Sequence, residues 1–492
     1  MELAAPPPPA APGDRDASLA DDPRRWWALA VLLLAQVTLI LDIAIVNVAV
    51  PAAQAELRIA PTDIQWLVTA YLLPFGALLL LGGRVADLAG RKRVFCVAAA
   101  GFAAASAAGG AAEDPGVLFA ARAVQGTFAA AMAPALLSML SLGFPSGPQR
   151  TRAFSLYGGV SAVAGALGLL LGGVLTEYLS WRWSLLINVP ICAVVLMGAV
   201  PLLRESAAST PPRFDLGGAV LATSGLLALI YGISTVAEEG WASPEALLPQ
   251  VAGAVLLTAF VGWEARAAEP LMPLSLLGDR TRAGGLVISG VGIAVPTAMA
   301  LLVLVFLQGP LDKSPFEAGL HFLPLPVAGL LGAFAALQLT PVVSTRVVLA
   351  AGTATTALGV FLVGQLDAGS SLAGGIAPGL ALVGFGDAIL FVAGNAIAMS
   401  GVPERDAGLA SAVVNATQQV CSALAVAVLS TVAASAATGY LADHGPEAAG
   451  AAIAHGNHRA LVLATLVMLA FGALAAALVA PRTRVTAHPV AA

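Results

Sequence analysis

The sequence is poor in charge, since only 10% of its residues are Asp, Glu, Lys or Arg, whereas 59% are hydrophobic. A soluble domain carries about 25% charged residues, so this composition excludes an ordinary soluble protein. Cysteine is scarce too, because Cys96, Cys192 and Cys421 fall singly in apolar segments without the C-x-x-C spacing of a redox or zinc site. No polar stretch exceeds roughly 25 residues, which excludes a large soluble domain.

Motifs typical of enzymes are also missing. The sequence contains no H-E-x-x-H, no G-x-S-x-G and no phosphate-binding G-x-x-x-x-G-K-[ST] motif. These absences argue against an intramembrane enzyme and an ATP-driven pump. We therefore expect no enzymatic activity, no cofactor, no metal and no nucleic-acid partner, whereas the net charge of −5 says little by itself in a membrane protein.

Apolar segments of about 20 residues, long enough to cross a bilayer as helices, are abundant. They predict an all-α membrane protein with fourteen transmembrane helices, at 26–50, 63–83, 94–112, 115–138, 153–176, 184–203, 216–236, 247–263, 283–308, 317–340, 347–366, 371–399, 407–437 and 459–480.

A polar stretch, EARAAEPLMPLSLLGDRTR, follows the eighth segment. It suggests two six-helix bundles, 26–203 and 283–480, separated by two extra helices and a cytoplasmic connection at 204–282. Residues 1–25 are expected to form a disordered cytoplasmic tail and 481–492 a second tail. Transporters are often built from repeated bundles with the site between them, so this division points to transport.

Basic residues fall mostly on one side of the predicted membrane. Only Arg58, Arg182, Lys313 and Arg459 lie in loops opposite the chain ends, and every other Lys or Arg except Arg122 lies on the side of the ends. Cytoplasmic loops are richer in Lys and Arg, so we expect both termini to be cytoplasmic. The sequence is rich in Ala and Gly and uses Arg more often than Lys, which suggests a bacterial source. We therefore expect a multi-pass protein of the bacterial cytoplasmic membrane.

Three ionisable residues, Asp42, Arg122 and Asp387, stand inside predicted spans, where each costs at least about 2.5–3.5 kcal/mol at mid-helix. Counted at about 1.5 Å per residue, Asp42 and Arg122 both lie roughly 10–14 Å below the outer boundary. We therefore expect them to interact, with Gln125 on the same helix face as Arg122. The pair is either a static ion pair or a proton carrier whose affinity changes as the two residues approach and separate. Because perturbed carboxylates cluster at functional sites, we favour proton coupling.

Asp387 lies near the midplane of its span, and Asn395 follows two turns later near the same face. An acid kept neutral or paired with a neighbour is one interpretation. We favour a substrate cavity in which Asp387 binds a cationic substrate or takes part in a second proton step. Asn47, Tyr71 and Gln125 are further cavity candidates, although hydrogen bonding between helices explains such residues equally well.

The cytoplasmic loop GGRVADLAGRKRVF is patterned, because Gly83 and Gly90 permit tight turns, Asp87 can accept hydrogen bonds, and Arg91 and Lys92 anchor the loop inside. On charge alone, a solvated basic loop is an equal alternative. The loop resembles the G-x-x-x-D-x-x-G-R-K/R loop of the major facilitator superfamily, and the resemblance implies a conformational gate. The segments LDIAIVNVAVP, QWLVTAYLL, RAVQGTFAAA and WRWSLLINVP resemble signatures of its fourteen-span drug:proton antiporter family.

Small residues form one face of the fifth predicted span, at Ser161, Gly165, Gly168 and Gly172. Such a face lets a neighbouring helix approach closely. Two positions depart from the family pattern: Leu169 replaces the proline of the family's G-P-x-x-G-G, and Ala44 replaces the usual threonine.

The resemblance implies a secondary active transporter that exports amphipathic drugs or a natural-product antibiotic in exchange for protons by alternating access. Its partners would be the small-molecule substrate, protons and the lipid bilayer, and we expect a monomer. A proton-coupled symporter that imports a small organic solute on the same fold is the alternative. A channel is disfavoured, because the transporter motifs occur in order and the buried charges are isolated.

Overall fold

The computed structural model describes residues 24–144, 147–205, 215–267, 270, 278–340, 342–366, 376–402 and 407–479. The predicted tails at 1–25 and 481–492 therefore lie outside the described residues, except that Arg24 and Arg25 begin the first helix. The regular structure within the described ranges is helical throughout.

The helices follow the predicted segments closely. The first group is α2 (Arg24–Leu57), α3 (Trp66–Ala89), α4 (Arg91–Gly110), α5 (Pro115–Gly143), α6 (Gly147–Tyr178), α7 (Trp183–Leu186) and α8 (Asn188–Leu202). Next come α9 (Leu216–Glu239) and α10 (Pro244–Glu264). The last group is α12 (Arg280–Gln308), α13 (Pro315–His321), α14 (Pro324–Leu339), α15 (Thr345–Val363), α16 (Ala377–Ala398), α17 (Ala407–His444), the 3-10 turn η3 (Pro446–Ala448) and α18 (Ala449–Leu478).

Thirteen stretches of the described residues are helical, long and apolar enough to cross a membrane. A fourteenth span is obtained when α3, which bends by 57° between Leu79 and Leu81, is taken as one crossing. The predicted all-α membrane fold is confirmed. Two boundaries were wrong, because α17 continues to His444 and α18 already begins at Ala449. The prediction placed a loop there because its polar residues lowered the local hydropathy, but these residues extend the two helices beyond the apolar segments.

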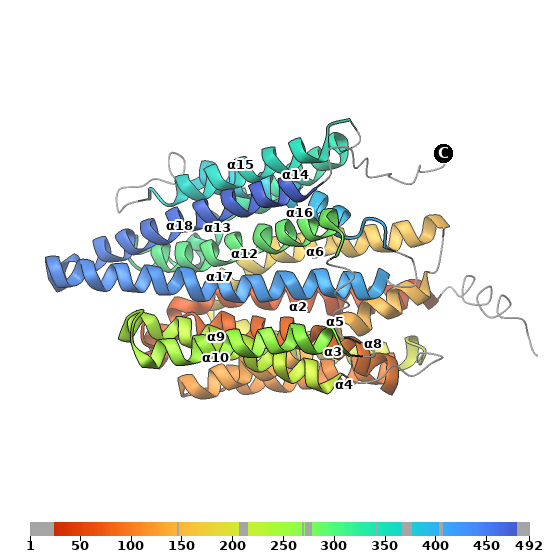
Figure 1. Cartoon of the computed structure of the whole chain (residues 1–492). Helices are drawn as coiled ribbons and strands as arrows, with labels where there is room; N and C mark the ends of the chain where they lie inside the picture. Colours follow the sequence, from red (N-terminus) through yellow and green to blue (C-terminus); the bar gives the residue numbers. More distant parts are fainter. Residues whose placement is uncertain are drawn as a thin grey trace, which may run out of the picture.

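We call α2 to α8 the first half of the chain and α12 to α18 the second half. In Figure 1, α3, α4 and α8 lie on one side of α17 and α14, α15 and α18 on the other, whereas α6, which packs against both α2 and α13, lies beside the second half. Helix α17 runs along the boundary between the halves and packs against α3. The additional helix α9 contacts both α3 and α17, and α10 packs on α9. The extra pair therefore covers one side of the boundary between the two halves.

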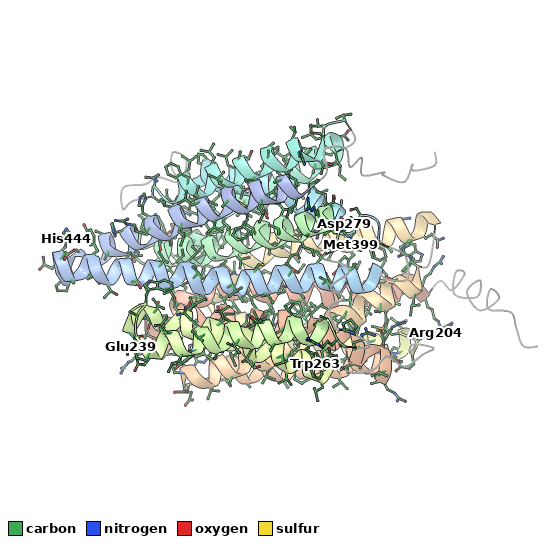
Figure 2. The ribbon with its side chains drawn as sticks, in the orientation of Figure 1. Arg204, Glu239, Trp263, Asp279, Met399 and His444 are labelled. Carbon is green, nitrogen blue, oxygen red and sulfur yellow. The ribbon has the colours of Figure 1, made fainter. Side chains whose placement is uncertain are left out.

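The connections alternate between the two ends of the bundle. Figure 2 shows Arg204, Asp279 and Met399 at one end, and Glu239 and His444 at the opposite end. We call these the Arg204 end and the His444 end. The first, fifth, ninth and thirteenth spans are α2, α6, α12 and α17. They all run from the Arg204 end to the His444 end.

The two halves meet toward the His444 end. Gln308 Nε2 of α12 donates to the Val48 carbonyl of α2 at 2.9 Å, and Phe316 N of α13 donates to Glu177 Oε2 of α6 at 3.0 Å. A Cβ atom on Gly319 would lie 2.7 Å from the Leu169 carbonyl oxygen, so α6 and α13 touch through their backbones. These contacts join the halves at this end.

Candidate functional site

Asp42 lies in the centre of the first half, on the buried face of α2, with 0% of its surface exposed. Its Oδ2 accepts a hydrogen bond from Arg122 Nη1 of α5 at 2.6 Å. Arg122 is itself 1% exposed. The structure thus brings together the two charges that the depth count placed at the same level.

Two amides complete the coordination of the carboxylate. Gln125 Nε2 of α5 donates to Asp42 Oδ1 at 2.8 Å, and Asn188 Nδ2 of α8 donates to the same oxygen at 2.7 Å. Gln125 also accepts from Arg122 Nη1 at 2.8 Å and donates to Ser106 Oγ of α4 at 2.7 Å. Asp42, Ser106, Arg122, Gln125 and Asn188 form the Asp42 cluster, and none is more than 1% exposed.

Helix α3 holds the guanidinium from the other side. Arg122 Nε donates to the Leu67 carbonyl at 3.0 Å, and Arg122 Cζ lies 4.4 Å from the centre of the Tyr71 ring, a cation–π contact. The backbones of α3 and α5 touch here, because a Cβ on Gly126 would lie 2.2 Å from the Tyr71 carbonyl oxygen. Tyr71 is therefore packed beneath Arg122 with 0% exposure.

The electrostatics of the cluster depend on the balance of its two charges. Moving a charge out of water is costly, and removal of one partner from a buried ion pair costs about 3–5 kcal/mol. Three hydrogen-bond donors converge on the carboxylate. A proton that binds to Asp42 would leave Arg122 buried without its counter-charge, so protonation and the position of Arg122 are coupled.

The small-residue face of α6 packs directly on the turn of α2 that carries Asp42. A Cβ on Gly168 would lie 2.6 Å from Ala44 Cβ, and one on Gly172 would lie 2.9 Å from the Ile45 carbonyl oxygen. One turn lower, a Cβ on Gly165 would lie 3.9 Å from Ile40 Cγ2, and Ser161 Oγ accepts from Gln36 Nε2 at 3.2 Å. Alanine at position 44 faces Gly168, and α6 runs unbroken through Leu169.

Asp387 stands in the second half, on α16. Its Oδ1 is buried and has no hydrogen-bond partner among the described residues, and a Cβ on Gly292 of α12 would lie 3.6 Å from that oxygen. Asn395, two turns further along α16, accepts from Gln418 Nε2 of α17 at 3.3 Å. Asn47, predicted for the same cavity, lies on α2 with 6% exposure and an Oδ1 that has no partner within the described ranges.

The two acids inside the spans, Asp42 and Asp387, lie at different depths. The Gln308–Val48 hydrogen bond places the end of α12 at the same depth as Val48 of α2. The two helices run in the same direction. Gly292, beside Asp387, precedes Gln308 by sixteen residues, whereas Asp42 precedes Val48 by six. At about 1.5 Å per residue, Asp387 is roughly 15 Å nearer the Arg204 end than Asp42.

The patterned loop between α3 and α4 is a tight turn at Gly90, whose φ of +98° favours glycine. Asp87 Oδ1 accepts from Arg91 Nε and Nη2 at 3.0 and 2.8 Å. Lys92 Nζ donates to the Val200 carbonyl of α8 at 2.7 Å. Gly83, near the end of α3, faces Pro134 of α5, at 3.5 Å from a Cβ added to the glycine.

The carboxylate of Glu205, which follows α8, accepts hydrogen bonds from the backbone N–H groups of Lys92 and Arg93 at 3.1 and 3.2 Å. It thereby caps the N-terminus of α4, where a carboxylate is favourable. Sequence reasoning missed Glu205, Ser106 and Asn188 as site residues. The one signal for Asn188 is its place in the WRWSLLINVP segment, which does not show which way its side chain points. Within the described ranges, no three His, Cys, Asp or Glu side chains are grouped to hold a metal ion.

Comparisons with known proteins agree with this geometry. The chain matches the family model of the Major Facilitator Superfamily over residues 32–426. It is 41% identical to the puromycin resistance protein of Streptomyces alboniger, over 96% of this chain and 95% of that protein. It is 39% identical to the cephamycin export protein of Amycolatopsis lactamdurans, over 85% of this chain and 86% of that protein.

Among solved structures, an auto-inhibited peptide transporter of the POT family superposes with a TM-score of 0.67 at 18% sequence identity, and the match covers 92% of this chain and 97% of that one. This likeness concerns the fold alone. The sequence matches and the helical architecture together show that the chain is a multi-pass membrane transporter and belongs to the major facilitator superfamily.

Proposed function

We propose that the protein exports amphipathic antibiotics or related natural products from a bacterial cell in exchange for protons. The observation that carries this proposal is the Asp42 cluster, a buried carboxylate that is held by a guanidinium and two amides and can carry a proton. The direction is supported by the relatives, which are named for puromycin resistance and cephamycin export.

The orientation follows from the basic residues. The Arg204 end, with the Arg91–Arg93 turn and Arg204, is the cytoplasmic face, and the His444 end is the outer face. The protein then acts as a monomer in the cytoplasmic membrane, with both termini inside. The bundle contacts at the His444 end close the outer face in the present conformation.

Proton binding drives the exchange through Arg122. When Asp42 is ionised, Arg122, Gln125 and Asn188 bind α5 and α8 to α2. When Asp42 is neutral, the guanidinium loses its buried counter-charge, which costs about 3–5 kcal/mol unless the helices rearrange. A bias of 3 kcal/mol changes an equilibrium by a factor of about 150, enough to switch the preferred conformation.

Asp387 is the substrate-side acid in this scheme. Its carboxylate has a buried oxygen without a partner among the described residues and lies roughly 15 Å closer to the cytoplasmic face than Asp42. It binds the cationic group of a substrate that enters from the cytoplasm, with Asn395 and Gln418 one to two turns nearer that face. The Asp87–Arg91 turn serves as part of the cytoplasmic gate.

Transport by the purified protein in proteoliposomes tests the proposal. A panel of amphipathic antibiotics that begins with puromycin is added to the side of the Arg204 end, and uptake is driven by an imposed pH gradient. We expect Asp42→Asn to lose gradient-driven transport and Asp443→Asn, which alters an exposed acid at the His444 end, to retain it. Undiminished transport by Asp42→Asn would overturn the proposal, and accumulation toward the cytoplasmic side would favour the symporter.

A further inference from the structure

A small cavity lies beside Arg122 on the side of the His444 end. It offers about 10 Å³ to the centre of a water molecule, close to the roughly 10–15 Å³ that one buried water requires. Arg122 and Ser184 are the polar side chains that line it, and Val46, Ala49 and Ala53 of α2 form one wall. Most of the lining is apolar, so Arg122 and Ser184 are the two residues available to bind a water in this space.

The wall on α2 continues the face that carries Asp42. Positions 42, 46, 49, 53 and 56 follow one another at intervals of four and three, which places them on one stripe of the helix. Glu56 ends this stripe, roughly 21 Å beyond Asp42 by helical rise. The cavity lies between these two carboxylates.

Trp181 separates the cavity from the solvent. Its side chain is 3% exposed and lines the cavity, and its indole N–H donates to Glu56 Oε2 at 2.8 Å. Arg182 also binds Glu56, and its Cζ lies 4.6 Å from the Trp181 ring centre. The Glu56 side chain is 51% exposed, so it connects the solvent of the His444 end with the lid that Trp181 forms.

We infer that this stripe is the route by which protons from the outer face reach Asp42, with one water bound between Trp181 and Arg122. The inference rests on the proposed proton exchange and specifies its path. Arg122 lines the inner end of the cavity, whereas Asp42 does not line it. A hydronium in the cavity is therefore repelled by the guanidinium and cannot reach Asp42 while the ion pair is closed.

The transfer occurs during a brief opening of the ion pair that separates Arg122 from Asp42, and protonation of Asp42 then prevents the pair from forming again. The extra proton of the hydronium then passes to a carboxylate oxygen of Asp42, which leaves a neutral carboxylic acid and a neutral water molecule. Because the ion pair must open first, the same contact that holds the helices together prevents a proton leak. Arg122 is in this sense the inner gate of the route and the Trp181–Glu56 contact is the outer one.

Two substitutions with opposite expected effects test the route. Val46→Ile adds one methylene group to the wall of the cavity, where it would displace the water, and should slow proton uptake from the outer face about tenfold. Trp181→Phe keeps an aromatic ring but removes the donor to Glu56, and should accelerate uptake severalfold. Uptake is followed with a pH-sensitive dye inside proteoliposomes after an acid jump on the outer face.

Matched controls make the same changes on exposed surfaces. Val124→Ile alters a side chain that is 46% exposed on α5, and Trp183→Phe alters one that is 41% exposed. Ser184→Ala, a small change that removes the second polar neighbour of the water, should slow uptake in the same direction as Val46→Ile. It keeps the test decisive if Val46→Ile does not fold.

The results separate the route from the exchange itself. If coupling depends on Asp42 but the cavity and lid variants take up protons at the rate of their controls, the route is wrong and the exchange stands. If Asp42→Asn retains coupling, the exchange itself is wrong. Opposite changes in Val46→Ile and Trp181→Phe, with both controls at the wild-type rate, would support the route.

Discussion

Replacement of Asn188 by leucine should shift the pH dependence of transport while leaving the fold nearly unchanged. Asn188 Nδ2 donates to Asp42 Oδ1 at 2.7 Å, and a hydrogen bond to a charged group contributes about 1.5–3 kcal/mol. Loss of this donor disfavours the ionised carboxylate, so a proton binds at a lower proton concentration. At about 1.4 kcal/mol per pH unit, the midpoint of the transport profile should rise by about 1–2 pH units.

The effect on stability should be smaller than the effect on the profile. Asn188 Oδ1 is buried without a hydrogen-bond partner among the described residues, and burial of an unsatisfied acceptor is unfavourable by about 1–3 kcal/mol. Leucine removes this acceptor together with the donor and has a similar size. The gain and the loss offset each other in the free energy of unfolding, whereas only the loss acts on the protonation of Asp42.

The measurement is gradient-driven uptake in proteoliposomes at a series of pH values, with the best-transported compound of the antibiotic panel. Asn457→Leu is the matched control, because Asn457 Nδ2 donates to the Leu302 carbonyl at 3.1 Å in the other half of the molecule. Its profile should match the wild type. A midpoint for Asn188→Leu within about 0.3 units of wild type would refute a contribution of this amide to proton binding.

Two further substitutions test the packing of α5 and the cap of α4. Gly126→Ala places a Cβ 2.2 Å from the Tyr71 carbonyl oxygen. Such overpacking costs about 1–3 kcal/mol, so the melting temperature in detergent should fall. The control Gly143→Ala, with no atom within 4 Å of the added Cβ, should melt like the wild type. Glu205→Ala removes the cap of α4 at a cost of about 1 kcal/mol, and equal melting of this variant and Glu239→Ala would argue against the cap.

The sequence predicted the Asp42–Arg122 pair because helical rise is constant. Two charges whose distances from the membrane boundary are equal must lie at one level, whatever the packing of the helices. The insertion cost of a charge in a membrane span marks these residues as unusual from the sequence alone. The depth of a residue, however, does not give the rotation of its helix about the helix axis. Depth alone therefore could not show which polar residues of other helices face the pair.

Asn188 and Ser106 were missed for that reason. Neutral amides and hydroxyls occur often between membrane helices, and only the rotation of α8 and α4 turns these two toward Asp42. Tyr71 and Gln125 were selected as cavity residues, and the structure places both against Arg122. The bend of α3 lies more than a turn from Pro74 but directly before the pair Gly82 and Gly83, and such pairs are common positions for a kink.

Helix α2 connects Asp42 with the contact between the two halves. Asp42 and Val48 are six residues apart, roughly 9 Å along one rigid helix, and Val48 accepts the hydrogen bond from Gln308 of the opposite half. Between them, Gly168 and Gly172 of α6 hold the backbone of α2 too closely for it to move independently. In the proposed exchange, a shift of α2 upon protonation of Asp42 would therefore move α6 as well. Because α6 meets α13 at Leu169 and Glu177, the proposed exchange would couple both contacts at the His444 end to the charge of one carboxylate.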